Sequence, residues 1–238
     1  MCGRFQLSVK GKEISERFNV EVHDEIHRPD TGAAQSLMRY NCAPMQWLPI
    51  ITNAAPQMLT PARWGLVPFW AKDATKAAKM INARAETVLQ KSAFKNAFLN
   101  RRCLVPSNGF YEWKKTTDKP AYRFFLKDKG LFAMAGLWDQ WKDNQGNVIQ
   151  TFTILTTNAN ALMQDIHERM PVILSSKDEN KWLNSNNTDE LQSLLKPYQS
   201  EDMDCYRVSS LVNSVANDNP QIVQPYKPTP DLFNQMEW

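Results

Sequence analysis

The 238-residue chain has only four cysteines and three histidines, and this scarcity excludes several kinds of site. The cysteines stand far apart, at positions 2, 42, 103 and 205, and no two of them have C-x-x-C spacing. We therefore expect neither a structural zinc site nor a disulfide framework. Unpaired cysteines without such a framework favour a reducing compartment, so the predicted location is cytoplasmic.

Long apolar runs are also missing. No run approaches the roughly 18 residues that a membrane-spanning helix needs, and no apolar stretch directly follows Met1. We expect neither a membrane segment nor a signal peptide. The net charge is only +3, which permits an anionic partner without requiring one. Because we find no repeat and no linker, we predict one domain over residues 1–238.

Strand-like segments outnumber helical ones and follow one another closely. This spacing predicts an α+β fold with an antiparallel or mixed, barrel-like sheet and short peripheral helices. The predicted strands are Trp47–Thr52, Gln57–Leu66, Arg102–Pro106, Phe110–Lys114, Ala121–Lys127, Leu131–Trp138, Val148–Thr157, Val172–Leu174 and Cys205–Ser209. The predicted helices are Glu13–Phe18, Glu86–Gln90, Ser92–Leu99, Ala161–Asp165, Lys177–Leu183 and Thr188–Leu195. Ser176 is predicted to cap the helix at Lys177, with Glu179 as its capping-box partner.

Position 2 offers chemistry that no internal residue can. Removal of Met1 would leave Cys2 with a free α-amine and a thiol on adjacent carbons. Their ordinary pKa values are about 7.7–8.0 and about 8.5, so each is partly nucleophilic near neutral pH. A 1,2-aminothiol captures an aldehyde by forming a Schiff base that the thiol closes into a thiazolidine. The alternative is that Cys2 is only a small residue at the start of a buried strand.

Three further polar positions are candidates for chemistry. Asn82 and Arg84 lie two apart, so in an extended segment they point the same way, although Asn82 could instead cap a helix starting near Ala83. Glu112 lies between two aromatic residues that could desolvate its carboxylate and raise its pKa, unless alternation places it on the solvent face. His167 lies at a predicted helix end, where it could shuttle protons or be an ordinary surface residue.

Basic and aromatic residues are interleaved in the middle of the chain. Lys72, Lys76 and Lys79 recur at helical spacing near aromatic residues such as Phe69 and Trp70. Single-strand nucleic-acid binders combine a basic track with stacking platforms. Solvated lysines over an aromatic core would give the same pattern, so this observation alone decides nothing.

Taken together, the motifs resemble one family. They are Met1-Cys2-Gly3-Arg4-Phe5, Tyr40-Asn41-Cys42-Ala43-Pro44, Trp64-Gly65-Leu66-Val67-Pro68 with Trp70, Ile81-Asn82-Ala83-Arg84-Ala85-Glu86-Thr87, Arg102-Cys103-Leu104-Val105-Pro106, Gly109-Phe110-Tyr111-Glu112-Trp113, Thr156-Thr157, His167-Glu168-Arg169-Met170-Pro171 and Val208-Ser209. The chain resembles the SRAP (SOS response-associated peptidase) family over residues 1 to about 210. The tail beyond residue 213 matches it less clearly.

The resemblance implies a single α+β domain around a barrel-like sheet and assigns roles to individual residues. It makes Cys2 the nucleophile and Asn82 the group that holds its amine. Glu112 is the implied acid/base, and His167 the residue that helps open the deoxyribose ring. The implied DNA-binding residues are Arg4, Arg84, Arg169, Trp70, Pro44 and Thr157.

The implied partner is single-stranded DNA that contains abasic sites, including single-strand/double-strand junctions. The implied activity is a covalent thiazolidine crosslink to the abasic sugar during the DNA damage response, by a monomer that needs no metal or organic cofactor. Two alternatives stay open: a cysteine-type peptidase acting through Cys2 and His167, with Met1 as its clearest target, and a non-enzymatic single-strand binding module.

Overall fold

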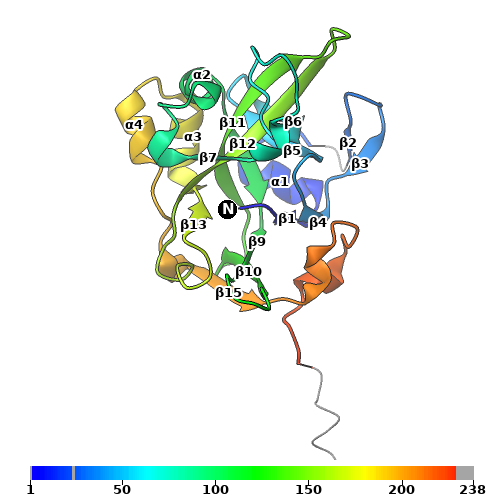
Figure 1. The fold of residues 1–238 in the computed structure, drawn as a ribbon, viewed down its shortest axis with the longest axis vertical. Helices are drawn as coiled ribbons and strands as arrows, with labels where there is room; N and C mark the ends of the chain where they lie inside the picture. Colours follow the sequence, from blue (N-terminus) through cyan, green and yellow to red (C-terminus); the bar gives the residue numbers. More distant parts are fainter. Residues whose placement is uncertain (1, 23–24, 229–238) are drawn as a thin grey trace, which may run out of the picture.

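A closed ring of five strands forms the centre of the molecule (Figure 1). The computed structural model describes residues 2–22 and 25–228. Around the ring the order is β12, β6, β5, β8 and β11, and β11 pairs again with β12. These strands are β5 (Trp47–Thr52), β6 (Ala55–Trp64), β8 (Arg102–Ser107), β11 (Phe132–Lys142) and β12 (Val148–Asn158). Only the β6–β12 pair is parallel within this ring, so the barrel is mixed.

The barrel interior is tightly packed because its strands carry apolar runs. Every residue of β5 and β8 is buried. At Gly136 on β11, an added Cβ would lie 2.7 Å from the Cys103 sulfur, so only glycine fits there. Trp64, at the end of β6, is fully buried with Phe5 and Phe152 at ring-centroid distances of 5.3 Å and 6.1 Å.

A second sheet, entirely antiparallel, packs beside the barrel in the order β15, β10, β9, β1, β4. Its strands are β1 (Phe5–Leu7), β4 (Arg39–Cys42), β9 (Gly109–Trp113), β10 (Ala121–Leu126) and β15 (Met203–Arg207). One apolar cluster continues from the barrel into this sheet through Phe5, Phe110 and Phe124. The two sheets therefore share a core and form one α+β domain.

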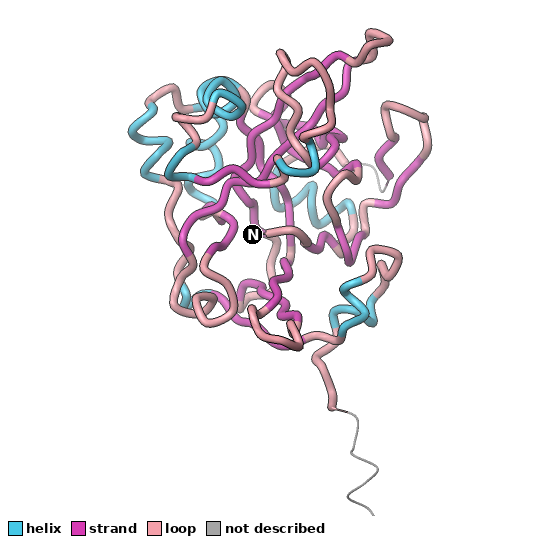
Figure 2. The backbone as a smooth tube through the Cα atoms, viewed as in Figure 1, coloured by secondary structure: helices cyan, strands magenta, loops and turns pink. Residues whose placement is uncertain are grey.

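Short helices surround the sheets (Figure 2), while short strands either extend the barrel sheet at β12 and β11 or form a separate two-stranded pair. The helices are α1 (Gly11–Phe18), α2 (Ser92–Asn100), α3 (Ser176–Asn184) and α4 (Thr188–Ser193), and the 3-10 segments are η1 (Ala77–Lys79), η2 (Ala85–Thr87), η3 (Ser200–Asp202), η4 (Ser210–Asn213) and η5 (Pro220–Val223). The short strands are β2 (Glu25–His27), β3 (Ala34–Ser36), β7 (Asn82–Arg84), β13 (Arg169–Pro171) and β14 (Ile173–Leu174). No helix within the described ranges is long and apolar enough to cross a bilayer.

The predicted fold class is confirmed, and each predicted strand overlaps an observed one. Three local predictions were wrong. Residues 161–165 form turns, in which the Asn160 side chain accepts a hydrogen bond from the Met163 amide. Residues 86–90 contain only the end of the 3-10 segment η2, followed by turns. The N-cap of α3 is Ser175, and the Glu179 carboxylate accepts hydrogen bonds from Arg17 instead of completing a capping box.

Candidate active site

Cys2 lies just before β1, the strand that β9 and β4 flank on either side. The residue is fully buried and belongs to the main apolar cluster. Figure 1 marks the chain's amino end at the centre of the molecule, among β7, β9 and β13. Burial, and secondarily the charge of Glu112, raise the pKa of the Cys2 thiol well above its ordinary range. The thiol is therefore held in its neutral form.

Asn82 reaches Cys2 from the barrel side of the site. It opens β7, which pairs in parallel with β12 through Asn82 and Ile154. The Asn82 side-chain amide donates a 2.8 Å hydrogen bond to the Cys2 carbonyl. Its side-chain oxygen is buried and has no hydrogen-bond partner among the described residues. The helix-cap interpretation of Asn82 is wrong, because the residue lies in a strand.

Glu112 approaches Cys2 from the second sheet. It lies on β9, opposite Tyr122 of β10, and only 3% of its surface is exposed. Burial raises the pKa of the Glu112 carboxyl to about 7. The solvent-face alternative is wrong, and the expected desolvation of the Glu112 carboxylate is confirmed. A carboxyl with this pKa exchanges protons readily at neutral pH.

His167 lies in the turn that leads into β13 and is half-buried. Its Nδ1 lies 3.0 Å from the Arg169 amide nitrogen and 3.1 Å from the Arg169 carbonyl oxygen, so the backbone of Arg169 holds the ring in place. Burial lowers the pKa of His167 below its ordinary value, and the positive charge of Lys115 lowers it further. The ring is therefore neutral at pH 7.

Lys115 connects the Glu112 strand to the His167 turn and is not among the residues predicted for the site. Its ammonium lies 3.1 Å from the Glu168 carboxylate, beside His167. The same positive charge acts on both Glu112 and His167 and lowers the pKa of each. Its place two residues after Trp113 is the only signal in the sequence that could have marked it.

The three predicted phosphate-binding arginines differ in availability. Arg4 is half-buried, and its guanidinium donates to the Asn41 side chain and to the Val212 carbonyl, both at 2.8 Å. Arg169 is buried and forms a bidentate ion pair with Glu86. Arg84 is exposed and makes no side-chain hydrogen bond or ion pair within the described residues. Arg84 is thus the arginine of the three whose guanidinium is free to meet a phosphate.

The other predicted DNA-binding residues are placed as follows. Trp70 is 53% exposed and lines a cavity of about 380 Å³ together with Lys72 and Lys76. Pro44 is half-buried, in a turn whose next residue donates its amide to the Trp64 carbonyl at 2.8 Å. Thr157 is buried and its hydroxyl donates to the Leu195 carbonyl, a placement that argues against the predicted DNA contact.

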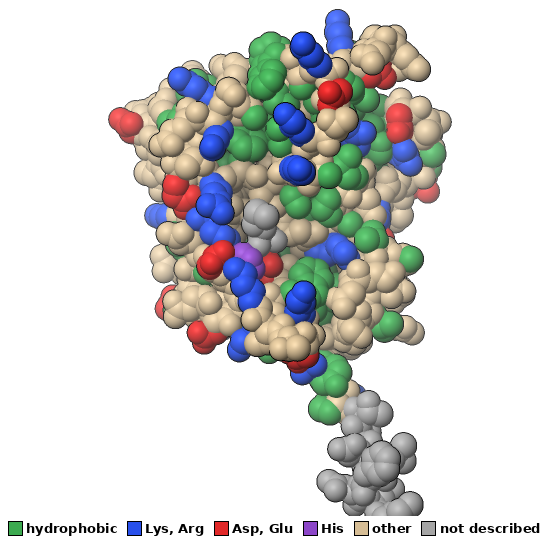
Figure 3. Space-filling view, viewed as in Figure 1, with side chains coloured by type: hydrophobic (Ala, Val, Ile, Leu, Met, Phe, Trp, Pro, Cys, Tyr) green, Lys and Arg blue, Asp and Glu red, His purple; other side chains and the backbone are tan. Residues whose placement is uncertain are grey.

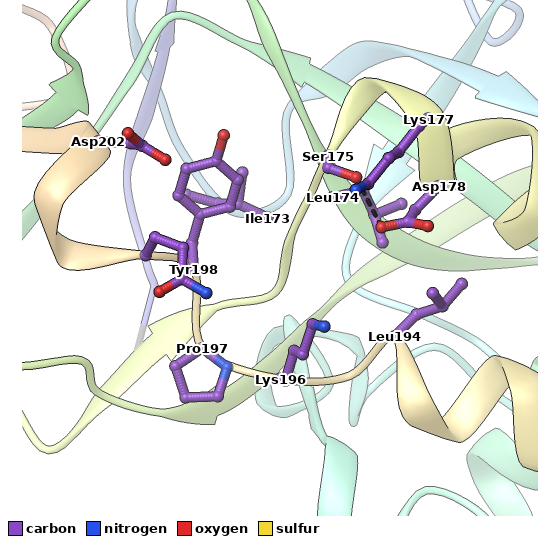
Figure 4. A pocket seen from close by; sticks show the side chains of 11 residues that line it. Ile173, Leu174, Ser175, Lys177, Asp178, Leu194, Lys196, Pro197, Tyr198 and Asp202 are labelled. Carbon is purple, nitrogen blue, oxygen red and sulfur yellow. Dashed lines mark hydrogen bonds between the residues drawn. The ribbon is translucent and has the colours of Figure 1, made fainter.

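Basic side chains cross the face that carries the site. Figure 3 shows Lys and Arg on both sides of the one histidine visible there, beside apolar patches. Within the described residues, no group of three or more histidine, cysteine, aspartate or glutamate side chains could hold a metal ion. Figure 4 shows a separate cavity of about 190 Å³, where the Ser175 hydroxyl donates to Asp178 at 2.6 Å. None of the predicted site residues lines that cavity.

Comparison with known proteins places this arrangement in a family. The family model described as SOS response associated peptidase (SRAP) matches residues 1–215. The chain belongs to the SRAP family. Abasic site processing protein YoqW of Bacillus subtilis is 45% identical over 233 residues, covering 95% of this chain and 100% of the relative. Abasic site processing protein HMCES of Gallus gallus is 34% identical over 200 residues, covering 73% of this chain and 59% of the relative.

Solved SRAP-like structures share the fold. A protein from Bacteroides thetaiotaomicron has a TM-score of 0.85 at 33% identity, covering 95% of this chain and 100% of its own. A protein from Bordetella bronchiseptica has a TM-score of 0.73 at 24% identity, covering 87% of this chain and 100% of its own. The second likeness concerns the fold alone, and both agree with the SRAP architecture predicted from the motifs.

Proposed function

We propose that this protein captures abasic sites in single-stranded DNA as a thiazolidine formed by Cys2 after removal of Met1. The observation that carries the proposal is the 2.8 Å hydrogen bond from Asn82 to the Cys2 carbonyl. It fixes the backbone of the residue whose amine would react. The names of the relatives, abasic site processing proteins, support an abasic sugar as the target.

The chemistry balances without a cofactor. The neutral Cys2 amine adds to the C1′ aldehyde of the opened sugar, and loss of one water gives an imine. The Cys2 thiol then adds to the imine carbon, and its proton goes to the nitrogen as the five-membered ring closes. The high pKa of the buried thiol supports this order, in which the amine attacks first. Ring closure removes the imine that would otherwise permit β-elimination of the strand.

Glu112 and His167 are the proposed proton-transfer groups. With a pKa of about 7, Glu112 can protonate the hydroxyl that leaves as water and can also accept a proton from the amine. The neutral His167 ring, held by the backbone of Arg169, can assist opening of the sugar to its aldehyde. The unpartnered buried oxygen of Asn82 is the acceptor proposed for an N–H of the Cys2 amine.

Affinity for DNA is proposed to come from phosphate contacts and stacking. Arg84 extends from the strand that carries Asn82, so a phosphate bound there would lie next to the reacting sugar. Trp70 provides an exposed ring for a neighbouring base. An intact base blocks C1′, so selectivity for abasic residues comes from the chemistry and needs no sequence readout. The same phosphate and stacking contacts could be made to the single-stranded part of a junction with duplex DNA.

Intact-mass spectrometry after incubation with an abasic oligonucleotide tests the proposal. Protein lacking Met1 should gain the mass of the oligonucleotide minus one water, and the adduct should survive heating. Cys2→Ala should bind the strand reversibly without forming that adduct, and Cys2→Ser should form far less of it. If Cys2→Ala formed a heat-stable adduct at wild-type yield, the proposal would be refuted. Hydrolysis of peptides by protein that fails to crosslink would favour the peptidase alternative.

A further inference from the structure

The segment between β6 and β7 presents two aromatic rings side by side in the sequence. Phe69 and Trp70 are each 53% exposed, whereas most large apolar side chains of the molecule are buried. Exposed neighbouring rings of this kind cost hydration free energy unless a partner covers them. Trp70 is already among the predicted DNA-binding residues, whereas Phe69 was noted only as part of the basic and aromatic pattern of this segment.

Buried groups of the barrel hold this segment in place at three points. The Asp139 carboxylate on β11 accepts a 3.0 Å hydrogen bond from the Phe69 amide. The Thr151 hydroxyl on β12 accepts a 2.9 Å hydrogen bond from the Val67 amide. The Trp141 indole donates a 2.7 Å hydrogen bond to the Ala71 carbonyl. An exposed loop with three such anchors keeps its shape before any ligand arrives.

Arg101 supports the Phe69 ring from the side. Its guanidinium lies 5.6 Å from the centroid of Phe69 and forms an ion pair with the buried carboxylate of Asp139. Asp139 therefore fixes both the backbone of Phe69 and the cation stacked on its ring. The arrangement resembles the way single-strand binders pair a ring with an arginine, because a base can stack on the ring while the cation attracts the backbone.

A backbone hydrogen bond limits the distance between the aromatic segment and the proposed reaction centre. The Leu66 amide donates a 3.1 Å hydrogen bond to the Met80 carbonyl, and Met80 is two residues before Asn82. From this cross-link the chain can extend by at most about 3.6 Å per residue, so Phe69 lies within about 25 Å of Asn82. A single strand of several nucleotides bound at Asn82 can span that distance.

We propose that Phe69 and Trp70 form a two-ring platform for bases flanking the abasic residue, with Asp139 as the positioning residue for Phe69. The inference rests on the proposed binding of single-stranded DNA. It assigns Phe69 and Arg101 to DNA binding and gives the buried Asp139 carboxylate a function. Lys72 and Lys76, which line the cavity beside Trp70, supply positive charge for the adjoining phosphates.

The test compares two oligonucleotides that differ only in the presence of bases. Both carry a central tetrahydrofuran residue, which has no aldehyde and so permits equilibrium binding. One has thymines around it, and the other has further tetrahydrofuran residues. Phe69→Leu should weaken binding of the thymine strand about 5- to 150-fold while leaving the base-free strand unchanged. Tyr226→Leu is the matched control, since Tyr226 is 38% exposed and Arg207 stacks on it at 4.2 Å.

Asp139→Ala and Arg101→Met test the positioning role. Asp139→Ala should speed amide exchange over residues 67–71 and weaken binding of the thymine strand more than of the base-free strand. Arg101→Met should weaken the same strand without speeding that exchange to the same extent. The inference is overturned if Phe69→Leu binds the thymine strand as wild type does, or weakens both strands equally. Wild-type protein that neither binds nor crosslinks abasic DNA would instead refute the proposed function.

Discussion

Arg169 donates one hydrogen bond to each oxygen of Glu86, at 2.7 Å and 2.9 Å. The pair joins β13 to η2, so it connects the segment that carries His167 with the segment that carries Asn82. Arg169 also donates to the Thr156 carbonyl at 2.6 Å, and its backbone amide holds His167. Two motifs that are far apart in the sequence are thus held together by one ion pair.

Glu86→Ala should lower both stability and the crosslinking rate. The change leaves the buried Arg169 guanidinium without its carboxylate, but Glu86 is partly exposed, so we expect a loss of about 1–2 kcal/mol. Crosslinking should slow because the amide that orients His167 becomes less fixed. Urea unfolding and single-turnover crosslinking measure the two effects. Glu168→Gln is the control, since its ion pair with Lys115 is exposed and should change stability by less than about 0.5 kcal/mol.

Glu112→Gln should slow crosslinking by about 10²- to 10⁴-fold if Glu112 is a full general acid or base. In the wild type, the carboxyl loses its proton as the pH rises through about 7, whereas the Cys2 amine becomes neutral near pH 7.7–8.0. The wild-type rate should therefore peak between these values and fall on either side. Glu112→Gln should lose the alkaline decline and keep the acid one.

His167→Ala provides an independent measure of the second proton-transfer group. Because the pKa of His167 is lowered and the ring is neutral at pH 7, its removal should slow the reaction most above the pKa of the free imidazole. DNA affinity should change little in either variant, since neither His167 nor Glu112 is a proposed phosphate contact. If the rates of Glu112→Gln and His167→Ala both match wild type at every pH, the two residues are structural.

Arg84→Ala should weaken binding to single-stranded DNA, whatever the base sequence of the strand. Arg84 is exposed and lies in β7, next to the proposed site of the abasic sugar. Loss of one phosphate contact should reduce the slope of log affinity against log salt by about 0.7–1. Titration across salt concentrations measures the slope. Arg28→Ala is a suitable control, because Arg28 pairs with Asp30 in the turn between β2 and β3; an Arg84→Ala slope equal to that of wild type would count against the contact.

Much of this architecture could be predicted from the sequence because its strands are apolar, β-branched runs. The predicted segment Trp47–Thr52 coincides with β5, and the predicted α2 differs by one terminal residue. These features depend on local composition, which the sequence displays directly. For Glu112 the sequence left both faces of the strand open, and the structure buries the side chain.

The features that could not be predicted from the sequence depend on contacts between distant segments. The Arg169–Glu86 pair and the Arg4 contacts with Val212 could not be seen, because opposite charges far apart in sequence give no signal of proximity. The turns at residues 161–165 replaced a helix because Asn160 bonds to the Met163 amide and to the Tyr198 carbonyl. Tertiary partners decided the local structure there.

Arg102 provides a prediction that concerns stability alone. Only 2% of its surface is exposed, yet its guanidinium forms no ion pair with any carboxylate in residues 2–22 and 25–228. Instead its five N–H groups donate to five carbonyl oxygens at the ends of two helices. These are the carbonyls of Phe98 and Leu99 in α2, and of Trp182, Leu183 and Ser185 in and after α3. The positive charge of Arg102 also interacts favourably with the negative, carboxyl-terminal end of each helix dipole.

Arg102→Met should therefore destabilise the protein by about 3–5 kcal/mol, because several buried helix-end carbonyls lose their donors. Arg102→Lys should recover only part of this stability, since the three N–H groups of a lysine ammonium cannot reach five carbonyl acceptors. Urea unfolding measures both losses, and α2 and α3 should show the largest gain in amide exchange. At a temperature where the variants stay folded, crosslinking per folded molecule should equal that of wild type. A stability of Arg102→Met within about 1 kcal/mol of wild type would show that water satisfies these carbonyls instead.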